Sequence, residues 1–201
     1  MWHYITSFGD SALLLPLIAW LGIVLTLAPS KRDAVRWGIA AIACGGLVAL
    51  SKLLFMAWGI GPPGLDYTGL SGHTALSVLT WPSLAAVLAR HARRPVRWLA
   101  IAAGACLGLA VGISRLALEV HSVSEVILGA ALGMIVAAWF IHGLTRHDAS
   151  PAWHAPLLGI GCVVLWLVFY GRVFPSQHLL KDIAIWVSGH SHVFTRRLHA
   201  L

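Results

Sequence analysis

Long apolar stretches alternate with short polar connections along almost the whole chain. The stretches cover residues 11–28, 35–58, 75–89, 98–113, 125–142 and 155–174. A hydrocarbon core of ~30 Å needs about 20 mostly apolar helical residues to cross it, and backbone polar groups in lipid must be satisfied within the segment. The pattern therefore predicts an all-α, polytopic membrane protein, a bundle of six transmembrane helices that forms one domain over residues 1–201.

Residues 175–201 form a tail with a weaker apolar pattern. Its apolar residues recur at helical spacing on either side of Lys181 and Asp182, namely Leu179, Leu180, Ile183, Trp186 and Val187. This spacing predicts a short helix that lies on the membrane surface. The tail also contains Ser188-Gly189-His190, which repeats a tripeptide found earlier in the chain. Because no long apolar stretch follows this copy, we interpret it as a chance repeat.

Composition agrees with a membrane protein. Hydrophobic residues make up 59% of the chain and charged residues 10%, whereas soluble domains have roughly 45–50% apolar and about 25% charged residues. The net charge of +7 does not indicate nucleic-acid binding, because no basic stripe is interleaved with aromatic residues that could stack on bases. The oligomeric state stays open.

Basic residues cluster in alternate connections. They lie between the first and second stretches, between the third and fourth, and after the fifth: Lys31, Arg32, Arg36, Arg90, Arg93, Arg94, Arg97 and Arg146. The positive-inside rule predicts that these connections are cytoplasmic. The connections 59–72 and 114–124 then face the other side, which we expect to be the periplasmic side of a bacterial inner membrane. The basic residues of the tail, Lys181, Arg196 and Arg197, disagree with this orientation.

Glycines recur every four residues in two neighbouring stretches. Gly104, Gly108 and Gly112 lie in the fourth, and Gly129 and Gly133 lie in the fifth. Small residues at this spacing let helix backbones approach closely in lipid. We therefore predict that the fourth and fifth stretches pack tightly against each other.

The two connections expected on the outer side carry most of the candidate chemistry. One ends in Ser71-Gly72-His73, and the other contains Ser114-Arg115, then His121, then Glu125. Lys52 approaches the same side from the end of the second stretch. A single ionisable residue near a helix end is usually an interfacial anchor, but a set of this kind on one side indicates a site.

Phosphoryl transfer suits this set of residues. Arg115 can hold a phosphate with a bidentate fork, and the free N–H groups at Ser71 and Gly72, where a helix begins, form an anion site. His121 can attack phosphorus as a neutral imidazole, and His73 can protonate the leaving oxygen. A carboxylate on the far ring nitrogen of His121 would fix its tautomer, and Glu125 lies one helical turn on.

These segments resemble the second and third signature motifs of the type 2 phosphatidic acid phosphatase superfamily. The second motif is Pro-Ser-Gly-His, matched at 70–73, and the third is Ser-Arg, five residues, His, three residues, Asp, matched at 114–125. The resemblance implies a metal-independent, cofactor-free hydrolase with Lys52, Ser71, Gly72, Ser114 and Arg115 around the phosphate. It also implies a lipid-phosphate substrate, such as phosphatidate, phosphatidylglycerol phosphate or an isoprenoid pyrophosphate, for example undecaprenyl pyrophosphate.

The chain departs from the motifs at three positions. Leu70 replaces the proline and Glu125 replaces the aspartate. The first motif is Lys, six residues, Arg-Pro, and counting from Lys52 the arginine position falls on Gly59. Loss of one preorganised donor can cost on the order of 10²–10³ in rate. We hypothesise that Arg172, at the outer end of the sixth stretch, or Lys181 supplies the missing cation; alternatively, Arg172 is an interface anchor.

Other interpretations of the same residues stay open. Ser122-Val123-Ser124-Glu125 reads as a helix capping box, a role that Glu125 could fill alone or together with orienting His121. The chain could be a non-catalytic or phosphotransferase relative that binds a lipid phosphate. His73 and His121 could also ligate haem between two helices, although haem ligation requires neither Ser-Gly before one histidine nor Ser-Arg before the other.

Overall fold

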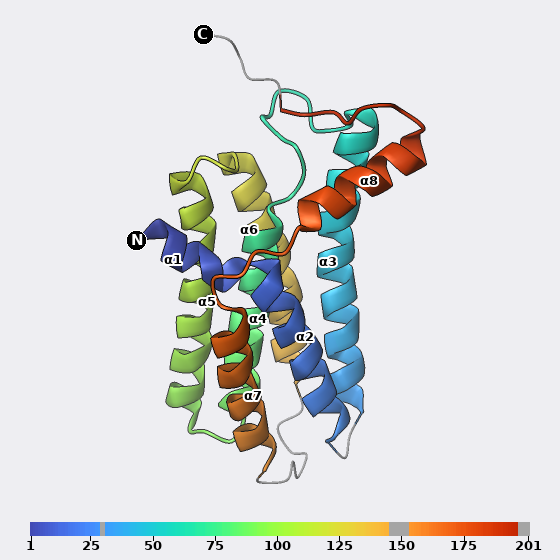
Figure 1. Cartoon of the computed structure of the whole chain (residues 1–201). Helices are drawn as coiled ribbons and strands as arrows, with labels where there is room; N and C mark the ends of the chain where they lie inside the picture. Colours follow the sequence, from blue (N-terminus) through green and yellow to red (C-terminus); the bar gives the residue numbers. More distant parts are fainter. Residues whose placement is uncertain (29–30, 145–152, 197–201) are drawn as a thin grey trace.

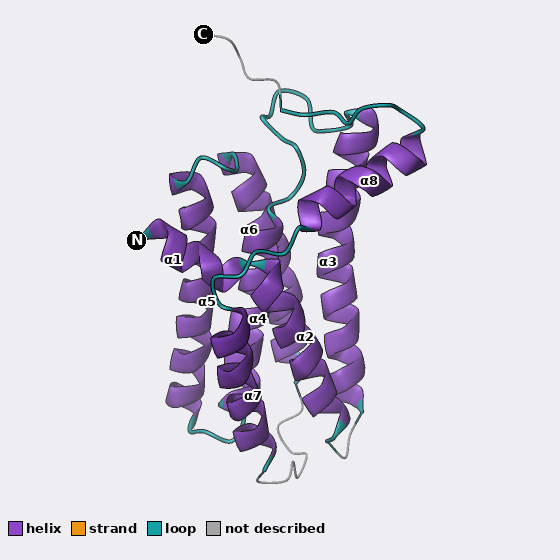
Figure 2. Cartoon of the chain, in the orientation of Figure 1, coloured by secondary structure: helices purple, strands orange, loops and turns teal. Residues whose placement is uncertain are grey.

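The computed structural model of the chain describes residues 1–28, 31–144 and 153–196. Arg146 and Arg197 lie outside the described residues. The described part consists of helices and loops, without strands (Figure 2). The helices are α1 (Trp2–Thr6), η1 (Ser7–Gly9), α2 (Ser11–Thr26), α3 (Arg32–Trp58), α4 (Gly72–Leu88), α5 (Arg94–Ala117), α6 (Val123–His142), α7 (His154–Phe169) and α8 (Ser176–Ser188). The predicted all-α class is confirmed.

Four helical segments are long and apolar enough to cross a membrane. They are Trp2–Thr26, Arg32–Trp58, Arg94–Ala117 and Val123–His142. The third and sixth predicted stretches are also helical, but α4 has 17 residues and α7 has 16. Figure 1 shows α2 to α7 running side by side along the bundle, with α1 and α8 crossing its upper half. The prediction of six membrane helices is thus confirmed for four by length and composition.

Helix α4 is the centre of the bundle, and it packs against both α5 and α6 along most of its length. A Cβ added at Gly108 of α5 would lie 2.8 Å from the Cα of Val78, and one at Gly129 of α6 would lie 2.9 Å from the carbonyl oxygen of Ser71. Both glycine stripes therefore face α4. The prediction that the fourth and fifth stretches form a tight pair is wrong, because α5 and α6 each meet α4 far more than each other.

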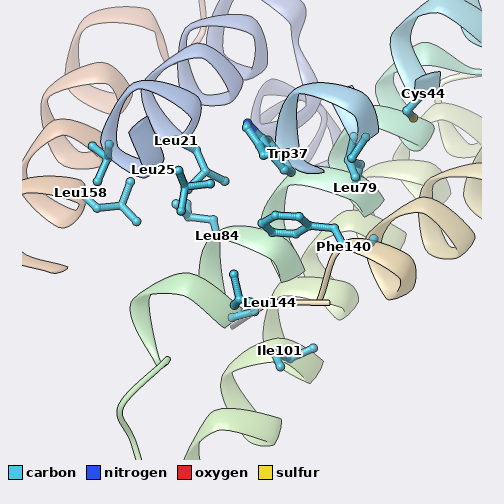
Figure 3. Close-up of a cluster of buried hydrophobic side chains, with 14 of the residues drawn as sticks. Leu21, Leu25, Trp37, Cys44, Leu79, Leu84, Ile101, Phe140, Leu144 and Leu158 are labelled. Atoms are coloured by element: carbon cyan, nitrogen blue, oxygen red, sulfur yellow. The ribbon is translucent and has the colours of Figure 1, made fainter. Parts of the chain in front are cut away.

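A hydrophobic cluster lies mainly in the half of the bundle where α3 begins and where α4 and α6 end. Trp37 and Phe140 are its largest side chains, and their rings pack with centroids 5.1 Å apart. Leu25, Leu84 and Leu158 belong to the same cluster (Figure 3). The other half also buries polar and ionisable side chains between the helices, among them Lys52, Ser71, Thr74, Ser114 and Glu125.

The other half of the bundle holds the connections that follow α3 and α5. The 59–71 loop and the turn between α5 and α6 lie at this end, and the segment that follows α8 returns beside the 59–71 loop (Figure 1). The tail contains the predicted short helix, α8, which packs on α3 with Trp186 84% exposed. Its position on the membrane surface stays a prediction. The N-terminal segment also reaches this half, and Gly9 allows it to lie tightly against Val111 and Ser77.

Candidate active site

The 59–71 loop is fastened to two helices just before α4 begins. The Leu70 N–H donates to Ser51 Oγ of α3 at 3.0 Å, and the Ser71 N–H donates to the carbonyl oxygen of Glu125 in α6 at 3.2 Å. Gly69 has a φ of +123° and lies so close to Lys52 that an added Cβ would be 2.6 Å from the Lys52 Cγ. These contacts bring the Ser71-Gly72-His73 segment against the start of α6.

His121 and Glu125 form the closest pair of ionisable groups at this end. His121 Nδ1 lies 2.6 Å from Glu125 Oε2, and the side chains are 7% and 0% exposed. The longer glutamate side chain therefore reaches the imidazole. The sequence hypothesis that Glu125 contacts the far ring nitrogen of His121 agrees with this geometry. The other ring nitrogen, Nε2, has no hydrogen-bond partner among the described residues.

Glu125 also caps its own helix. Its Oε2 accepts from the Ser122 N–H at 3.2 Å, while the Glu125 N–H donates to Ser122 Oγ at 3.4 Å, which completes a capping box. Its Oε1 accepts from both the N–H and the hydroxyl of Thr68 at 2.6 Å. The two roles considered for Glu125 are thus compatible, and the cap fixes the carboxylate that faces His121.

His73, in the first turn of α4, also faces a carboxylate. Its Nε2 lies 3.7 Å from Asp10 Oδ2, and the side chains are 24% and 14% exposed. Asp10 is the N-cap of α2, where its Oδ1 accepts from the Ala12 N–H at 2.8 Å. Asp10 was not among the site residues predicted from the sequence. Its position as a helix cap was visible in the sequence, but its approach to His73 depends on how the N-terminal segment packs.

Two cations lie near the histidines. Arg115, in the last turn of α5, donates from Nη1 to Thr6 Oγ1 at 2.9 Å, and its buried Nε has no hydrogen-bond partner among the described residues. Lys52 is 7% exposed and makes no described hydrogen bond. His73, His121 and Lys52 each interact electrostatically with Arg115. The described structure therefore brings together the basic groups that the sequence placed on one side.

The hydroxyl groups of the two candidate serines form hydrogen bonds within their own helices. Ser114 Oγ donates to the Val111 carbonyl oxygen at 2.6 Å, and Ser71 Oγ lies 2.9 Å from Thr74 Oγ1. Both serines are fully buried. The Ser71 N–H already donates to the backbone carbonyl oxygen of Glu125. The free N–H groups at the start of α4 are therefore those of the first turn, beginning with Gly72.

His121 opens toward a cavity of about 550 Å³, which is also lined by Asp66, Glu119 and Arg196. Burial lowers the pKa of His121 below its ordinary value, and the hydrogen bond with Glu125 opposes this shift only in part. At neutral pH the imidazole is therefore mostly uncharged. A neutral ring with one nitrogen held by a carboxylate and the other free is suited to nucleophilic attack or to general-base chemistry.

The role of the two cations proposed as substitutes, Arg172 and Lys181, stays a prediction, because neither has a described hydrogen bond or ion pair with the histidines. Arg172 is exposed in the turn after α7, and no described hydrogen bond or ion pair joins its side chain to the histidines. Lys181 lines a neighbouring cavity with Thr68, Phe194 and Arg196. A different cation, Arg196, contacts Glu125 directly: its Nη2 lies 2.9 Å from Glu125 Oε1. The sequence analysis noted Arg196 only as an exception to the orientation.

Within residues 1–28, 31–144 and 153–196, no group of three His, Cys, Asp or Glu side chains is arranged to hold a metal ion. The acidic groups at this end instead contact histidine, arginine or backbone N–H groups, as described above for Asp10 and Glu125.

The comparisons with known proteins identify a family for the chain. The profile of the PAP2 superfamily matches residues 58–149, which include both histidines, Arg115 and Glu125. The chain is 40% identical over 199 residues to the "Uncharacterized 22.5 kDa protein in cps region" of Klebsiella pneumoniae, with 97% of this chain and 95% of that protein covered. No solved structure matches the chain. PAP2 proteins are generally phosphatases, so membership indicates phosphatase activity. The chain belongs to the PAP2 superfamily.

Proposed function

We propose that this protein is an integral membrane phosphatase with six membrane helices. It would hydrolyse a lipid phosphate or an isoprenoid pyrophosphate through a phosphohistidine intermediate, at a site on the extracytoplasmic face. The observation that carries the proposal is the contact of 2.6 Å between His121 Nδ1 and Glu125 Oε2, with Nε2 left without a described partner. This arrangement holds one tautomer of the imidazole, with the proton on Nδ1 and a lone pair on Nε2.

In the first step, His121 Nε2 forms a bond to phosphorus while the bond from phosphorus to the leaving oxygen breaks. The positive charge that develops on the imidazole is stabilised by Glu125. His73 donates its proton to the leaving oxygen and becomes neutral. In the second step, neutral His73 accepts a proton from water as the water oxygen attacks phosphorus. The phosphorus–nitrogen bond breaks, and free phosphate and the starting protonation states result.

The charge on the phosphoryl oxygens needs cationic donors as the bonds change. Arg115 has an unpartnered buried Nε, and Lys52 has no described hydrogen bond, so both can turn to a phosphate. The first-turn N–H groups of α4, from Gly72 onward, add the partial positive charge of a helix N-terminus. Stabilisation by such preorganised groups is usually the largest contribution to phosphoryl transfer.

A lipid-linked substrate fits the position of the site. The histidines lie at one end of helices whose outer faces expose large apolar side chains, among them Ile113 of α5 and Ile127 of α6. A phosphate group at the level of the lipid headgroups would meet the site while its chain stays among the apolar outer faces. Both a monophosphate and a diphosphate present the terminal phosphoryl group that His121 would attack.

Phosphate release from a panel of substrates tests the proposal. Detergent-purified protein is incubated with phosphatidate, phosphatidylglycerol phosphate and polyprenyl diphosphate in the presence of EDTA. We expect release by the wild type and loss of release by His121→Ala. The matched control is His91→Ala, since His91 is exposed at the other end of the bundle. Equal release by the wild type and His121→Ala would contradict the proposal, as would a covalent phosphate label that survives acid, which hydrolyses phosphohistidine.

The orientation has its own test. A cysteine introduced at Leu65, which is 51% exposed beside the site, is compared with one at His91, and the native cysteines are replaced by serine. We expect a membrane-impermeant maleimide to label Leu65→Cys in intact spheroplasts and His91→Cys only after permeabilisation. The reverse pattern would place the site on the cytoplasmic face.

A further inference from the structure

The segment after α8 is fixed to the end of α3. Helix α8 ends at Gly189, and His190 Nδ1 then lies 3.0 Å from the Ala57 carbonyl oxygen. The Phe194 N–H donates to the Met56 carbonyl oxygen at 2.9 Å. Residues 190–196, here called the return segment, thus contact the last turn of α3 at two points. The Ser188-Gly189-His190 tripeptide, interpreted as a chance repeat, ends α8 and starts this contact.

Gly59 provides the surface on which the return segment packs. It ends α3 with a φ of +68°, a conformation that favours glycine. A Cβ at this position would lie 3.0 Å from the Phe194 ring. The position that in the family motif carries an arginine therefore carries a glycine covered by an aromatic side chain of the return segment.

Arg196, two residues beyond Phe194 in the return segment, places its guanidinium against the site. Arg196 Nη2 lies 2.9 Å from Glu125 Oε1, and Arg196 Nε lies 3.0 Å from Asp66 Oδ1. Glu125 is fully buried, and its other oxygen holds His121. Arg196 and His121 also line the same cavity of about 550 Å³. The chain thus connects the tail to the proposed nucleophile through a single carboxylate.

This contact has an electrostatic consequence. A buried carboxylate beside an imidazole stabilises the imidazolium form, which cannot attack phosphorus. A guanidinium on the second carboxylate oxygen reduces the negative charge that the imidazole senses, while it also fixes the carboxylate in place. Arg196 therefore orients Glu125. It also weakens the tendency of the Glu125 carboxylate to keep His121 protonated.

We propose that the return segment is part of the active site, and that Arg196 is a positioning residue that acts on His121 through Glu125. This inference rests on the proposed function for its role in turnover. It gives a role to a tail cation that disagreed with the predicted orientation. Arg196 touches the carboxylate that holds the nucleophile, and it is placed by Phe194 on Gly59.

Three variants test this role in the full-length protein. Arg196→Ala should lower kcat about 10–100-fold, the range seen when the hydrogen-bonding partner of a metal-bound histidine is removed, with KM changed less than about threefold. Arg196→Lys keeps the charge and should recover most of kcat. Phe194→Ala releases the segment from Gly59 and should lower kcat in the same direction. Arg93→Ala, an exposed cation at the other end of the bundle, is the charge-matched control and should match the wild type.

The protonation of His121 gives a readout that is independent of turnover. The charged and titratable groups around it are Glu125, Lys52, Arg115, His73, Asp66, Glu119 and Arg196. Loss of Arg196 leaves the negative charge of Glu125 uncompensated, so we expect the pKa of His121 to rise by about 0.5–1 unit. Nuclear magnetic resonance of ring-labelled histidine, with His121→Ala to assign the signal, measures this shift. Arg196→Lys should leave the pKa near that of the wild type.

The outcomes separate the two proposals. If the wild type releases no more phosphate than His121→Ala, the proposed function fails, and the His121 titration alone decides whether Arg196 acts through Glu125. If the wild type is active and Arg196→Ala keeps both its kcat and its His121 titration, the positioning role is overturned. A higher kcat in Arg196→Ala would also overturn it, because the segment would then obstruct the site.

Discussion

The two histidines of the site are each paired with a carboxylate, but the two pairs are built differently. His121 and Glu125 belong to one helix start, lie 2.6 Å apart and are locked by a capping box. His73 and Asp10 come from different helices and lie 3.7 Å apart. The first pair depends on local geometry, whereas the second requires that the N-terminal segment dock against α4. A pair made within one turn holds its imidazole more rigidly than one made across the bundle.

The histidine of the tighter pair, His121, is also the more buried of the two. The side chain of His121 is 7% exposed and that of His73 is 24% exposed. A nucleophile benefits from a fixed direction of attack, and a proton donor must exchange protons with water between turnovers. The difference in build therefore supports assigning His121 as the nucleophile and His73 as the acid and base.

Removal of each imidazole should separate the roles most strongly. We expect His121→Ala to lose on the order of 10⁴-fold or more in kcat, as for other nucleophiles, with every substrate. His73→Ala should lose as much with a lipid phosphate, whose alkoxide needs a proton. With p-nitrophenyl phosphate, whose leaving group needs no proton, His73→Ala should recover at least tenfold relative to the lipid substrate. Parallel steady-state assays on both substrates measure the difference.

The p-nitrophenyl substrate also provides the control for misfolding. A variant that recovers activity with an easier leaving group is folded, so recovery by His73→Ala excludes a general loss of structure. Recovery by His121→Ala instead of His73→Ala would mean that the two roles are exchanged. Equal recovery by both would show that neither histidine forms the covalent bond.

Glu125→Gln should have the next largest effect. Glutamine keeps the size of the side chain but cannot stabilise the positive charge that develops on His121, and it removes the partner of Arg196. We expect a loss of about 10²–10³-fold in kcat, the range for a preorganised electrostatic group. Glu125→Asp keeps the charge but shortens the reach, so its activity should lie between that of Glu125→Gln and the wild type. A Glu125→Gln variant within threefold of the wild type would reduce Glu125 to a helix cap.

Asp10→Asn should have a smaller effect. Asparagine is as good an N-cap as aspartate, so this change removes the charge that faces His73 while it preserves the start of α2. Because the contact is longer and more exposed than that of Glu125, we expect a loss of about tenfold in kcat. Ser11→Ala, next to the same cap, is the matched control. A loss as large as that of Glu125→Gln would mean that the two pairs are equivalent.

The same contrast explains what the sequence could and could not predict. His121 and Glu125 are four residues apart at a helix start, so their contact follows from helical geometry. The helices themselves follow from their apolar stretches. Asp10 and Arg196 lie far along the chain from their partners, and each reaches the site through packing of a terminal segment. The glycine stripes show a similar limit, because their spacing indicates a close contact without naming the partner, and the partner was α4.

The two histidines should also differ in how they affect the pH dependence, although this effect is small. Burial lowers the pKa of His121, so its neutral form persists to a pH below the ordinary value of about 6.5. The acid limb of kcat/KM, which reports groups of the free enzyme, should therefore have its midpoint below that value. The hydrogen bond with Glu125 favours the charged ring, so Glu125→Gln should move the limb to still lower pH. Asp10→Asn should leave the acid limb in place, because Asp10 faces the other histidine. A limb that shifts in Asp10→Asn but not in Glu125→Gln would assign the titration to His73.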